Sequence, residues 1–474
     1  MLTTLDNFFN TCTGFLFGPI MLCVFFGTGI LMTVITRGVQ FRKFGVAVRT
    51  VFGNLKKKES GDGQLKPFEA LATALSGCVG NGNVVGVVAA LVSGGPGAIF
   101  WMWVAAITGM ATKYAEIMLA MHYREKDDKG IWRGGVMYIL TRGMKDNWKW
   151  LGKIFAVVFA LCCVLVSFIS CNAVQSSSIV SVLGSSIPAV PGWVWGLIFS
   201  ALSALVIMGG LKKIGSVCSI LTPVMAIVYI IASLIIIFAN ITHIGKAFGM
   251  IFQGAFNAEA ALGAAFGITI KTSITKGIAR GCFSNEAGLG SAPMAHAATS
   301  EKDPVKQGFF GIFEVFMDTI IICTLTSLVV LTTVAAAGGE SVGIAWGTSG
   351  GASIVTACMA RIISGGVSGV LVAVCLSLFA FSTILSWSLY GTRCFEYLFG
   401  TKASIGYKIV FILFAVVGAT LSLNDAWNLA DALNGFMAIP NLVAVLMLSP
   451  VVIRLTKEYF AKNRNVESLA DTAD

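Results

Sequence analysis

Small and polar residues interrupt an apolar stretch between residues 68 and 93. The run Ser76-Gly-Cys-Val-Gly-Asn-Gly-Asn83 places three glycines and two asparagines near its middle. Unwound backbone is tolerated at membrane depth only where it is buried in protein or lines a watery cavity. The helix ends that such a break creates can hold a cation on their carbonyls and a carboxylate on their amides. Close helix packing through small residues is the alternative, but the two asparagine amides favour a polar site.

A second apolar stretch, residues 258–280, carries Gly263, Gly267 and Gly277. It is the fifth apolar segment after the first interrupted stretch, and it would cross the membrane in the opposite direction. Two interrupted helices in corresponding places of two halves are typical of inverted-repeat membrane transporters, although glycine is also common in ordinary membrane helices. Lys271 lies near mid-stretch, where it must reach the interface, pair with an acid or serve as a built-in cation. These three roles stay open.

Adjacent hydroxyls, Ser382 and Thr383, occupy a third apolar stretch at residues 363–390. Hard cations prefer oxygen ligands, so these hydroxyls and the free carbonyls of the first break could share a cation. The alternative is that each hydroxyl bonds only to its own helix. Trp387, one turn further on, could wall an apolar pocket or simply pack.

Charged groups near the membrane segments suggest two further interactions. Arg280 and Glu286 could form an ion pair at a gate, or their segment could be a helix-capping turn. Lys113 and Glu116 share one helix face, which favours a structural ion pair between them.

Several function classes have little support. The chain has only three histidines, which gives thin support to a proton relay, and it has no Walker A motif for ATP-driven pumping. The 12 cysteines are scattered without a CxxC pair, so neither a disulfide framework nor a metal site of cysteines is expected.

The composition is that of a polytopic membrane protein. Hydrophobic residues make up 56% of the 474 residues and charged residues only 12%, against about 25% charged in soluble domains. A membrane-crossing helix needs about 20 apolar residues. The sequence predicts eleven crossings, at residues 14–36, 68–93, 97–121, 152–175, 190–210, 216–240, 258–280, 308–336, 363–390, 405–422 and 428–453.

Basic residues lie almost entirely in alternate loops. Segments 37–66 and 124–149 are rich in lysine and arginine, and the tail from Arg454 falls on the same side, whereas the loop 176–189 has no charge. The positive-inside rule therefore predicts a protein of the cell (plasma) membrane with its C-terminus in the cytoplasm and its N-terminus outside. Because most of the basic residues sit in loops between apolar segments, the net charge of +10 does not indicate nucleic-acid binding.

The basic loops are expected to be solvated linkers that mark the topology. This applies to residues 56–63 and 124–149, and the polar tail from residue 458 onward is expected to be frayed. Contact of the lysines with anionic lipid headgroups is the alternative use of these charges.

Five motifs occur in a fixed order along the chain: GPG at 95–97, KYAE at 113–116, FSNEAGLGSAP at 283–293, FAFSTILSWSLYG at 379–391 and AIPNL at 438–442. Through them the chain resembles the alanine or glycine:cation symporter family, within the group that has the leucine-transporter-type fold. The resemblance covers nearly the whole chain, and the two long motifs are the specific ones.

The resemblance implies a fold, an activity and partners. The fold would be an all-α membrane domain with an extra N-terminal helix (14–36), two inverted five-helix repeats (68–240 and 258–453) and a cytoplasmic tail (454–474). Each repeat would begin with a discontinuous helix. The activity would be sodium-coupled import of a small neutral amino acid, alanine or glycine, by alternating access. The partners would be that amino acid, a sodium ion and membrane lipid, without nucleic acid, organic cofactor or enzymatic chemistry.

The resemblance also assigns site residues. The amino acid would be bound by the first break, by polar residues of the fourth segment and by side chains that close the pocket: Gly77, Cys78, Gly80, Asn81, Gly82, Asn83, Asn172, Gln175, Phe266, Ile270, Thr272 and Trp387. Sodium would be coordinated by the carbonyls of Ser76, Val79 and Phe379 and by the hydroxyls of Ser382 and Thr383.

The chain departs from the family at the pocket. Many members have Thr where this chain has Asn81, and small or amide residues are usual where it has Lys271 and Thr272. These changes keep open a proton-coupled symporter or one that prefers glutamine. A channel would need a continuous polar pore, and a membrane enzyme would need a convergent acid, base or nucleophile set. The few charges within the membrane segments argue against a channel, and the sequence shows no such set for an enzyme.

Overall fold

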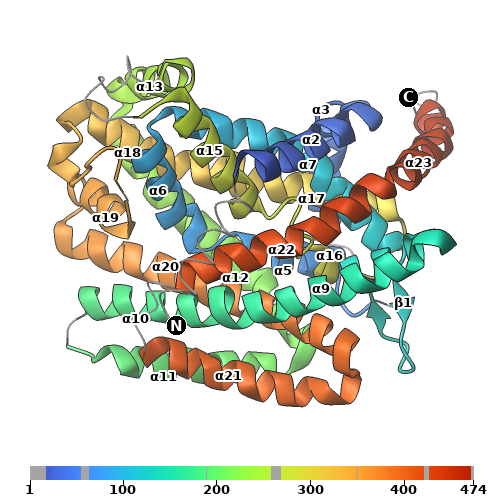
Figure 1. Ribbon diagram of the computed structural model, residues 1–474. Coiled ribbons are helices and arrows are strands. Elements are labelled where there is room, and N and C mark those ends of the chain that lie inside the picture. The colour runs from blue at the N-terminus through green and yellow to red at the C-terminus, as the bar shows by residue number, and fades with distance from the viewer. Residues whose placement is uncertain are drawn as a thin grey trace.

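The computed structural model describes residues 18–54, 63–187, 189–257, 268–348, 350–420 and 426–470. Within these residues the chain forms helices and loops, apart from one two-stranded hairpin (Figure 1). The hairpin pairs β1 (Glu125–Lys126) antiparallel with β2 (Trp132–Arg133). The protein is therefore all-α, as its apolar segments predict.

Helices lie at the predicted apolar segments. Single helices are α2 (Pro19–Ile35), α7 (Gly97–His122), α11 (Gly192–Ile207), α12 (Gly210–Ala239), α20 (Gly365–Phe399), α21 (Ser404–Thr420) and α22 (Ala426–Met447). Two more segments continue through a π-helical turn: α9 (Lys149–Phe168), η3 (Ile169–Ala173) and α10 (Val174–Ser186) form one, and α17 (Pro304–Val315), η6 (Phe316–Cys323) and α18 (Thr324–Ala337) form the other.

The described helices include several that can cross a membrane. By length and apolar composition five of them can do so singly, and two bent pairs can each do so as one unit. The chain is thus built to cross the membrane several times. The count of eleven crossings stays a prediction.

The first predicted break is present. The helix α5 (Pro67–Cys78) ends, one 3₁₀ turn follows as η1 (Asn81–Asn83), and α6 (Val85–Gly94) resumes after a bend of 59°. The Gly80 amide donates to Asn83 Oδ1 at 2.9 Å. A side chain therefore replaces the backbone acceptor that a continuous helix would supply.

The second stretch does not break where the sequence predicts. The helix α15 runs without interruption from Ile270 to Asn285, so the predicted interruption at Gly277 is wrong. A Cβ at Gly277 would overlap the carbonyl oxygen of Ala98, and the glycine instead allows α15 to pack closely on α7. The other two glycines, Gly263 and Gly267, lie outside the described residues.

A break does follow α15, further along the chain. Glu286, Gly288 and Gly290 have left-handed backbone angles, with φ of 54°, 98° and 79°. The short helix α16 (Pro293–His296) comes next. Since α15 contacts α6 whereas α16 contacts α5, the two pieces lie beside opposite halves of the first broken helix.

Further helices and turns complete the described chain. They are α3 (Val39–Arg42), α4 (Phe44–Asn54), α8 (Val136–Gly143), α13 (Ile244–Phe256), α19 (Ala352–Ala360) and α23 (Ser449–Ala470), with 3₁₀ turns η2 (Asp146–Trp148), η4 (Ile241–His243), η7 (Glu340–Val342) and η8 (Thr401–Ala403). The tail expected to be frayed from residue 458 is helical as far as Ala470.

The segment 124–149 is not the solvated linker that the sequence predicts. Four apolar residues of α8 are buried: Val136, Met137, Ile139 and Leu140. The Arg133 guanidinium pairs with the Asp127 carboxylate at 2.8 Å and also with Glu396 of α20. Although partial burial works the other way, hydrogen bonds from the Ile131 amide and the Arg133 side chain lower the pKa of Asp127. The hairpin is thereby fixed to the end of α20.

Candidate functional site

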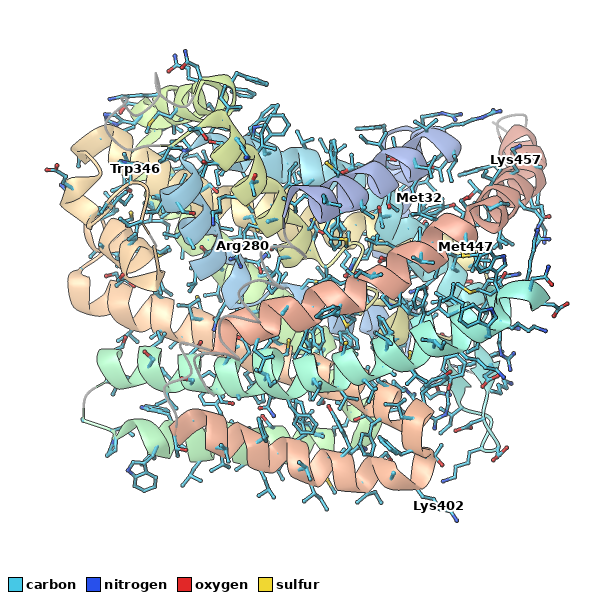
Figure 2. The ribbon with its side chains drawn as sticks, viewed as in Figure 1. Met32, Arg280, Trp346, Lys402, Met447 and Lys457 are labelled. Carbon is cyan, nitrogen blue, oxygen red and sulfur yellow. The ribbon has the colours of Figure 1, made fainter. Side chains whose placement is uncertain are left out.

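A cavity of about 540 Å³ lies between the two broken helices. Its walls are the first break and α6, the π-helical turn η3, the end of α15, the second break, α20 and α22. Arg280 of α15, labelled near the centre of Figure 2, forms part of the wall. The Asn83 side-chain amide donates to Ser284 Oγ at 3.1 Å, so the first break and the end of α15 meet directly.

Oxygen atoms of α5 and α20 converge beside this cavity. Thr383 Oγ1 donates toward the Phe379 carbonyl at 3.0 Å and lies 3.2 Å from the Ser76 carbonyl. Ser382 Oγ lies 2.9 Å from the Phe379 carbonyl, so its described bond is to its own helix. Val79, which caps α5, packs in the same apolar cluster as Phe379. Thr383 therefore links α5 and α20, the two helices whose residues are predicted to hold sodium.

Four buried polar atoms in the cavity wall have no hydrogen-bond partner among the described residues. They are Asn81 Oδ1, Gln175 Oε1, Trp387 Nε1 and Asn434 Oδ1. Leaving a buried polar group unpaired costs about 1–3 kcal/mol, so such groups require a ligand or water. Three acceptors and one donor around one cavity suit a small molecule with an ammonium group. Asn434 was not predicted, although its amide in an apolar segment was visible in the sequence.

Asn172 does not line this cavity. Its side-chain amide donates to the Phe411 carbonyl at 2.6 Å and ties the π-helical turn η3 to α21. Ser170 and Cys171 of the same turn line the cavity together with Gln175. The structure thus brings only one of the two predicted residues of this segment to the site.

Two residues predicted from the middle of the seventh segment, Ile270 and Thr272, do not line the cavity. Ile270 is 42% exposed, and Thr272 lies in the first turn of α15, where its amide donates to Thr269 Oγ1 at 3.2 Å. Lys271 is exposed in the same turn rather than buried at mid-helix. Phe266 lies outside the described residues.

A buried carboxylate beside the cavity had no role assigned from the sequence. Asp318, in the π-helical turn η6, accepts hydrogen bonds from Asn83 Nδ2 at 2.6 Å, from Ser284 Oγ at 2.9 Å and from Thr319 Oγ1 at 2.8 Å. Asn83 therefore faces this carboxylate and holds the first break in place. An acidic residue in an apolar segment was the available signal.

The predicted pair between Lys113 and Glu116 is not formed. Lys113 Nζ pairs instead with Glu314 Oε1 at 3.0 Å, and Cys78 Sγ lies 3.2 Å from the same oxygen. Glu116 accepts from the Gly288 amide at 2.8 Å. Lys113 therefore pairs with α17 and Glu116 bonds to the second break, rather than to one another.

The Arg280–Glu286 segment behaves as a helix-capping turn. Glu286 ends α15 with a left-handed backbone, and its carboxylate bonds to Ser291 Oγ. The Arg280 guanidinium lies 5.4 Å from the ring centre of Phe283. Among the described side chains, no ion pair joins Arg280 to Glu286.

Comparison with known proteins places the chain in a family. A model of the sodium:alanine symporter family matches residues 2–472. The sodium/alanine symporter AgcS of Methanococcus maripaludis is 44% identical over 456 residues, which cover 96% of this chain and 97% of that protein. The probable sodium/glutamine symporter GlnT of Bacillus subtilis is 32% identical over 96% of this chain and 91% of its own length. The crystal structure of MhsT in complex with L-phenylalanine covers 82% of this chain and 97% of MhsT, with a TM-score of 0.56 at 15% identity, which shows a shared fold.

Proposed function

Because the chain belongs to the sodium:alanine symporter family, and is therefore a cation-coupled amino-acid symporter of the membrane rather than an enzyme, we propose that it imports alanine or glycine together with Na⁺. The cavity between the broken helices is the proposed binding site. The unpartnered polar atoms in its wall are the observation that carries the proposal.

The polar groups of this wall suggest one orientation for the amino acid. Its carboxylate would lie at Gly80 and Gly82, beside the positive end of α6. Its ammonium group would donate to the free oxygens of Asn81, Gln175 and Asn434. The ring of Trp387 and the remaining wall residues, among them Gly77 and Cys78, would surround a small side chain.

The coupling ion would bind next to the amino acid. The carbonyls of Ser76, Val79 and Phe379 and the hydroxyls of Ser382 and Thr383 supply the oxygen ligands that a hard cation prefers. Na⁺ bound there would hold the end of α5 against α20 and so fix the break that binds the amino acid. Each solute would then increase the affinity for the other by the same factor.

The wider architecture follows the same proposal. Eleven helices would cross the membrane, with one extra N-terminal helix and two inverted five-helix repeats. The second discontinuous helix would be broken at Glu286–Gly290 instead of within residues 258–280. With the N-terminus outside, α6 and α15 would lie in the outer half, so the cavity would face outward. The buried Lys113–Glu314 pair would close the inner side.

Transport into proteoliposomes tests the proposal. Labelled alanine should accumulate when an inward Na⁺ gradient is imposed, and unlabelled glycine should compete. Accumulation that is driven by a pH gradient and indifferent to Na⁺ would indicate a proton-coupled symporter. Stronger competition by glutamine than by alanine would indicate a glutamine symporter, and ion currents without amino acid would indicate a channel.

A further inference from the structure

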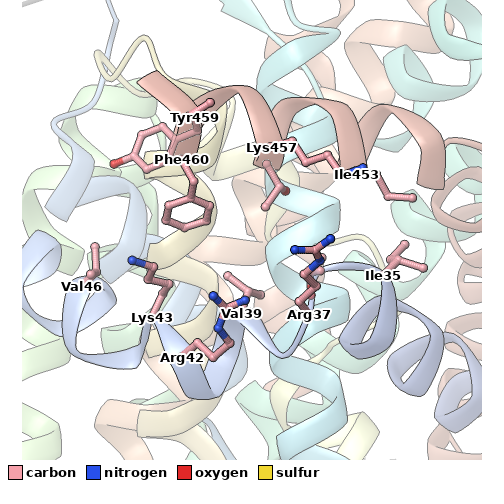
Figure 3. Close-up of a pocket in the computed structure, with 13 residues that line it drawn as sticks. Ile35, Arg37, Val39, Arg42, Lys43, Val46, Ile453, Lys457, Tyr459 and Phe460 are labelled. Atoms are coloured by element: carbon pink, nitrogen blue, oxygen red, sulfur yellow. The ribbon is translucent and has the colours of Figure 1, made fainter. Parts of the chain in front are cut away.

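A second cavity, of about 610 Å³, lies where the N-terminal helices meet the C-terminal helix. One side is formed by the end of α2 and by α3 and α4, and the other side by α23 (Figure 3). It shares no wall residue with the cavity between the broken helices.

Four basic side chains line this second cavity: Arg37, Arg42, Lys43 and Lys457. Figure 3 shows the charged ends of Arg37, Arg42 and Lys43 rising from the α2–α4 side toward α23. The wall residues include no Asp or Glu, and among the described side chains none of the four makes an ion pair. Like charges around one hollow repel each other, so the cavity favours an anion.

The neighbouring basic residue of α23 shows the contrast. Arg454 lies between the wall residues Ile453 and Thr456 but does not itself line the cavity, and it pairs with Glu458 at 3.9 Å. Lys43 has a different partner, since its Nζ lies 4.8 Å from the ring centre of Phe460. The charges directed into the cavity are therefore the ones left without an acidic partner.

The cavity also has an apolar wall that continues onto exposed apolar side chains of α2 and α3. Ile35, Val39 and Ile453 line it. Directly beside it, Val34 of α2 is 66% exposed and Phe41 of α3 is 62% exposed. A small inorganic anion would make no favourable contact with this apolar surface, whereas an acyl chain would cover it.

We propose that this cavity binds an anionic phospholipid. The headgroup phosphate would lie among the four basic side chains, since Arg and Lys are the usual phosphate partners. An acyl chain would run over Val34 along the apolar face of α2. The lipid would thereby join the N-terminal helices to α23, independently of which amino acid or ion the protein transports.

Native mass spectrometry of the purified protein with phosphatidylglycerol and phosphatidylcholine of identical acyl chains tests this directly. The wild type should bind phosphatidylglycerol at least tenfold more tightly. The triple variant Arg37→Gln/Arg42→Gln/Lys43→Gln should bind both lipids equally. The control Lys212→Gln/Lys213→Gln/Lys402→Gln removes as many positive charges elsewhere and should keep the preference. If the triple variant does not fold, the single variant Arg42→Gln should weaken phosphatidylglycerol binding at least threefold.

Three outcomes would overturn the proposal. The triple variant could retain the wild-type preference, or the control could lose it equally, which would indicate diffuse surface charge. Glycerol phosphate, which has no acyl chain, could bind the site as tightly as the lipid and displace it. That result would indicate a site for free anions. Thermal unfolding in detergent without added lipid reports folding and should be unchanged in both triple variants.

Discussion

Lys113 Nζ lies 3.0 Å from Glu314 Oε1, and both side chains are completely buried. The pair joins α7 to α17, and Glu314 Oε2 also lies 3.2 Å from His296 Nε2 in α16. A buried charge is costly unless it is paired. This pair therefore fixes the helices that surround the two breaks.

Removing one partner of this pair should destabilise the protein far more than removing both. Lys113→Met should destabilise the protein by about 3–5 kcal/mol, because Glu314 would keep an uncompensated buried charge. The double variant Lys113→Met/Glu314→Met should recover much of that loss, since apolar residues of similar volume can replace a buried pair. Denaturant unfolding in detergent measures both, with the exposed Lys276→Met as control. A double variant no more stable than Lys113→Met alone would contradict the pairing.

The hydroxyl of Thr383 should matter for Na⁺ and not for the fold. Thr383→Val keeps the shape of the side chain and removes an oxygen that lies 3.2 Å from the Ser76 carbonyl. The Na⁺ concentration for half-maximal alanine uptake should rise about ten- to hundredfold, as expected for loss of about 1.5–3 kcal/mol at a charged ligand. Thr392→Val on the same helix, whose hydroxyl bonds to the Ser388 carbonyl, should leave that concentration unchanged. Equal effects of both substitutions would refute the assignment of Thr383.

Substitutions of Gln175 and Asn172, which lie three positions apart, should have opposite effects on alanine binding and on stability. Gln175→Leu removes an unpartnered oxygen from the cavity wall, so alanine should bind about tenfold more weakly while thermal stability is maintained. Asn172→Leu breaks the bond to the Phe411 carbonyl and should lower stability by about 1–3 kcal/mol. Isothermal titration and thermal unfolding separate the two effects. Weaker alanine binding by a fully stable Asn172→Leu protein would place Asn172 at the site after all.

Alanine substitutions at two glycines, Gly277 and Gly82, should likewise have different effects. A Cβ at Gly277 would overlap the Ala98 carbonyl, whereas a Cβ at Gly82 meets no atom within 4 Å. Gly277→Ala should therefore push α15 off α7 and destabilise the protein by about 1–3 kcal/mol. Gly82→Ala should fold normally and bind alanine more weakly, because its methyl group would enter the cavity. A destabilised Gly82→Ala protein that still binds alanine normally would reverse this distinction.

The first break could be predicted because its signal is local. Glycines and asparagines stand between two apolar runs, and no tertiary contact is needed to see that a helix cannot continue comfortably there. The pairing of Thr383 with α5 was also accessible, since it follows from oxygen chemistry once the family resemblance places the two segments together.

The second break could not be placed in the same way. Hydropathy locates apolar residues but not their depth, and the polar run after Arg280 looks like a loop beyond the end of a span. Tertiary contacts of α15 with α6 and α7 are needed to show that Glu286 instead lines the cavity between the broken helices. In the same way, the π-helical turn at Ile169–Ala173 shifts the helix register. That shift determines whether Asn172 or Gln175 lines the cavity, and the pattern of residues in the sequence does not predict it.

Reciprocal binding of alanine and Na⁺ to the purified protein is the most direct test of the central claim, that one cavity at the first break holds both solutes. The dissociation constant for alanine would be titrated at several Na⁺ concentrations, with K⁺ keeping the ionic strength constant and the pH fixed. Na⁺ should tighten alanine binding, and alanine should tighten Na⁺ binding by the same factor, about 5- to 150-fold for typical coupling. An alanine dissociation constant that is the same in Na⁺ and in K⁺ would contradict the claim.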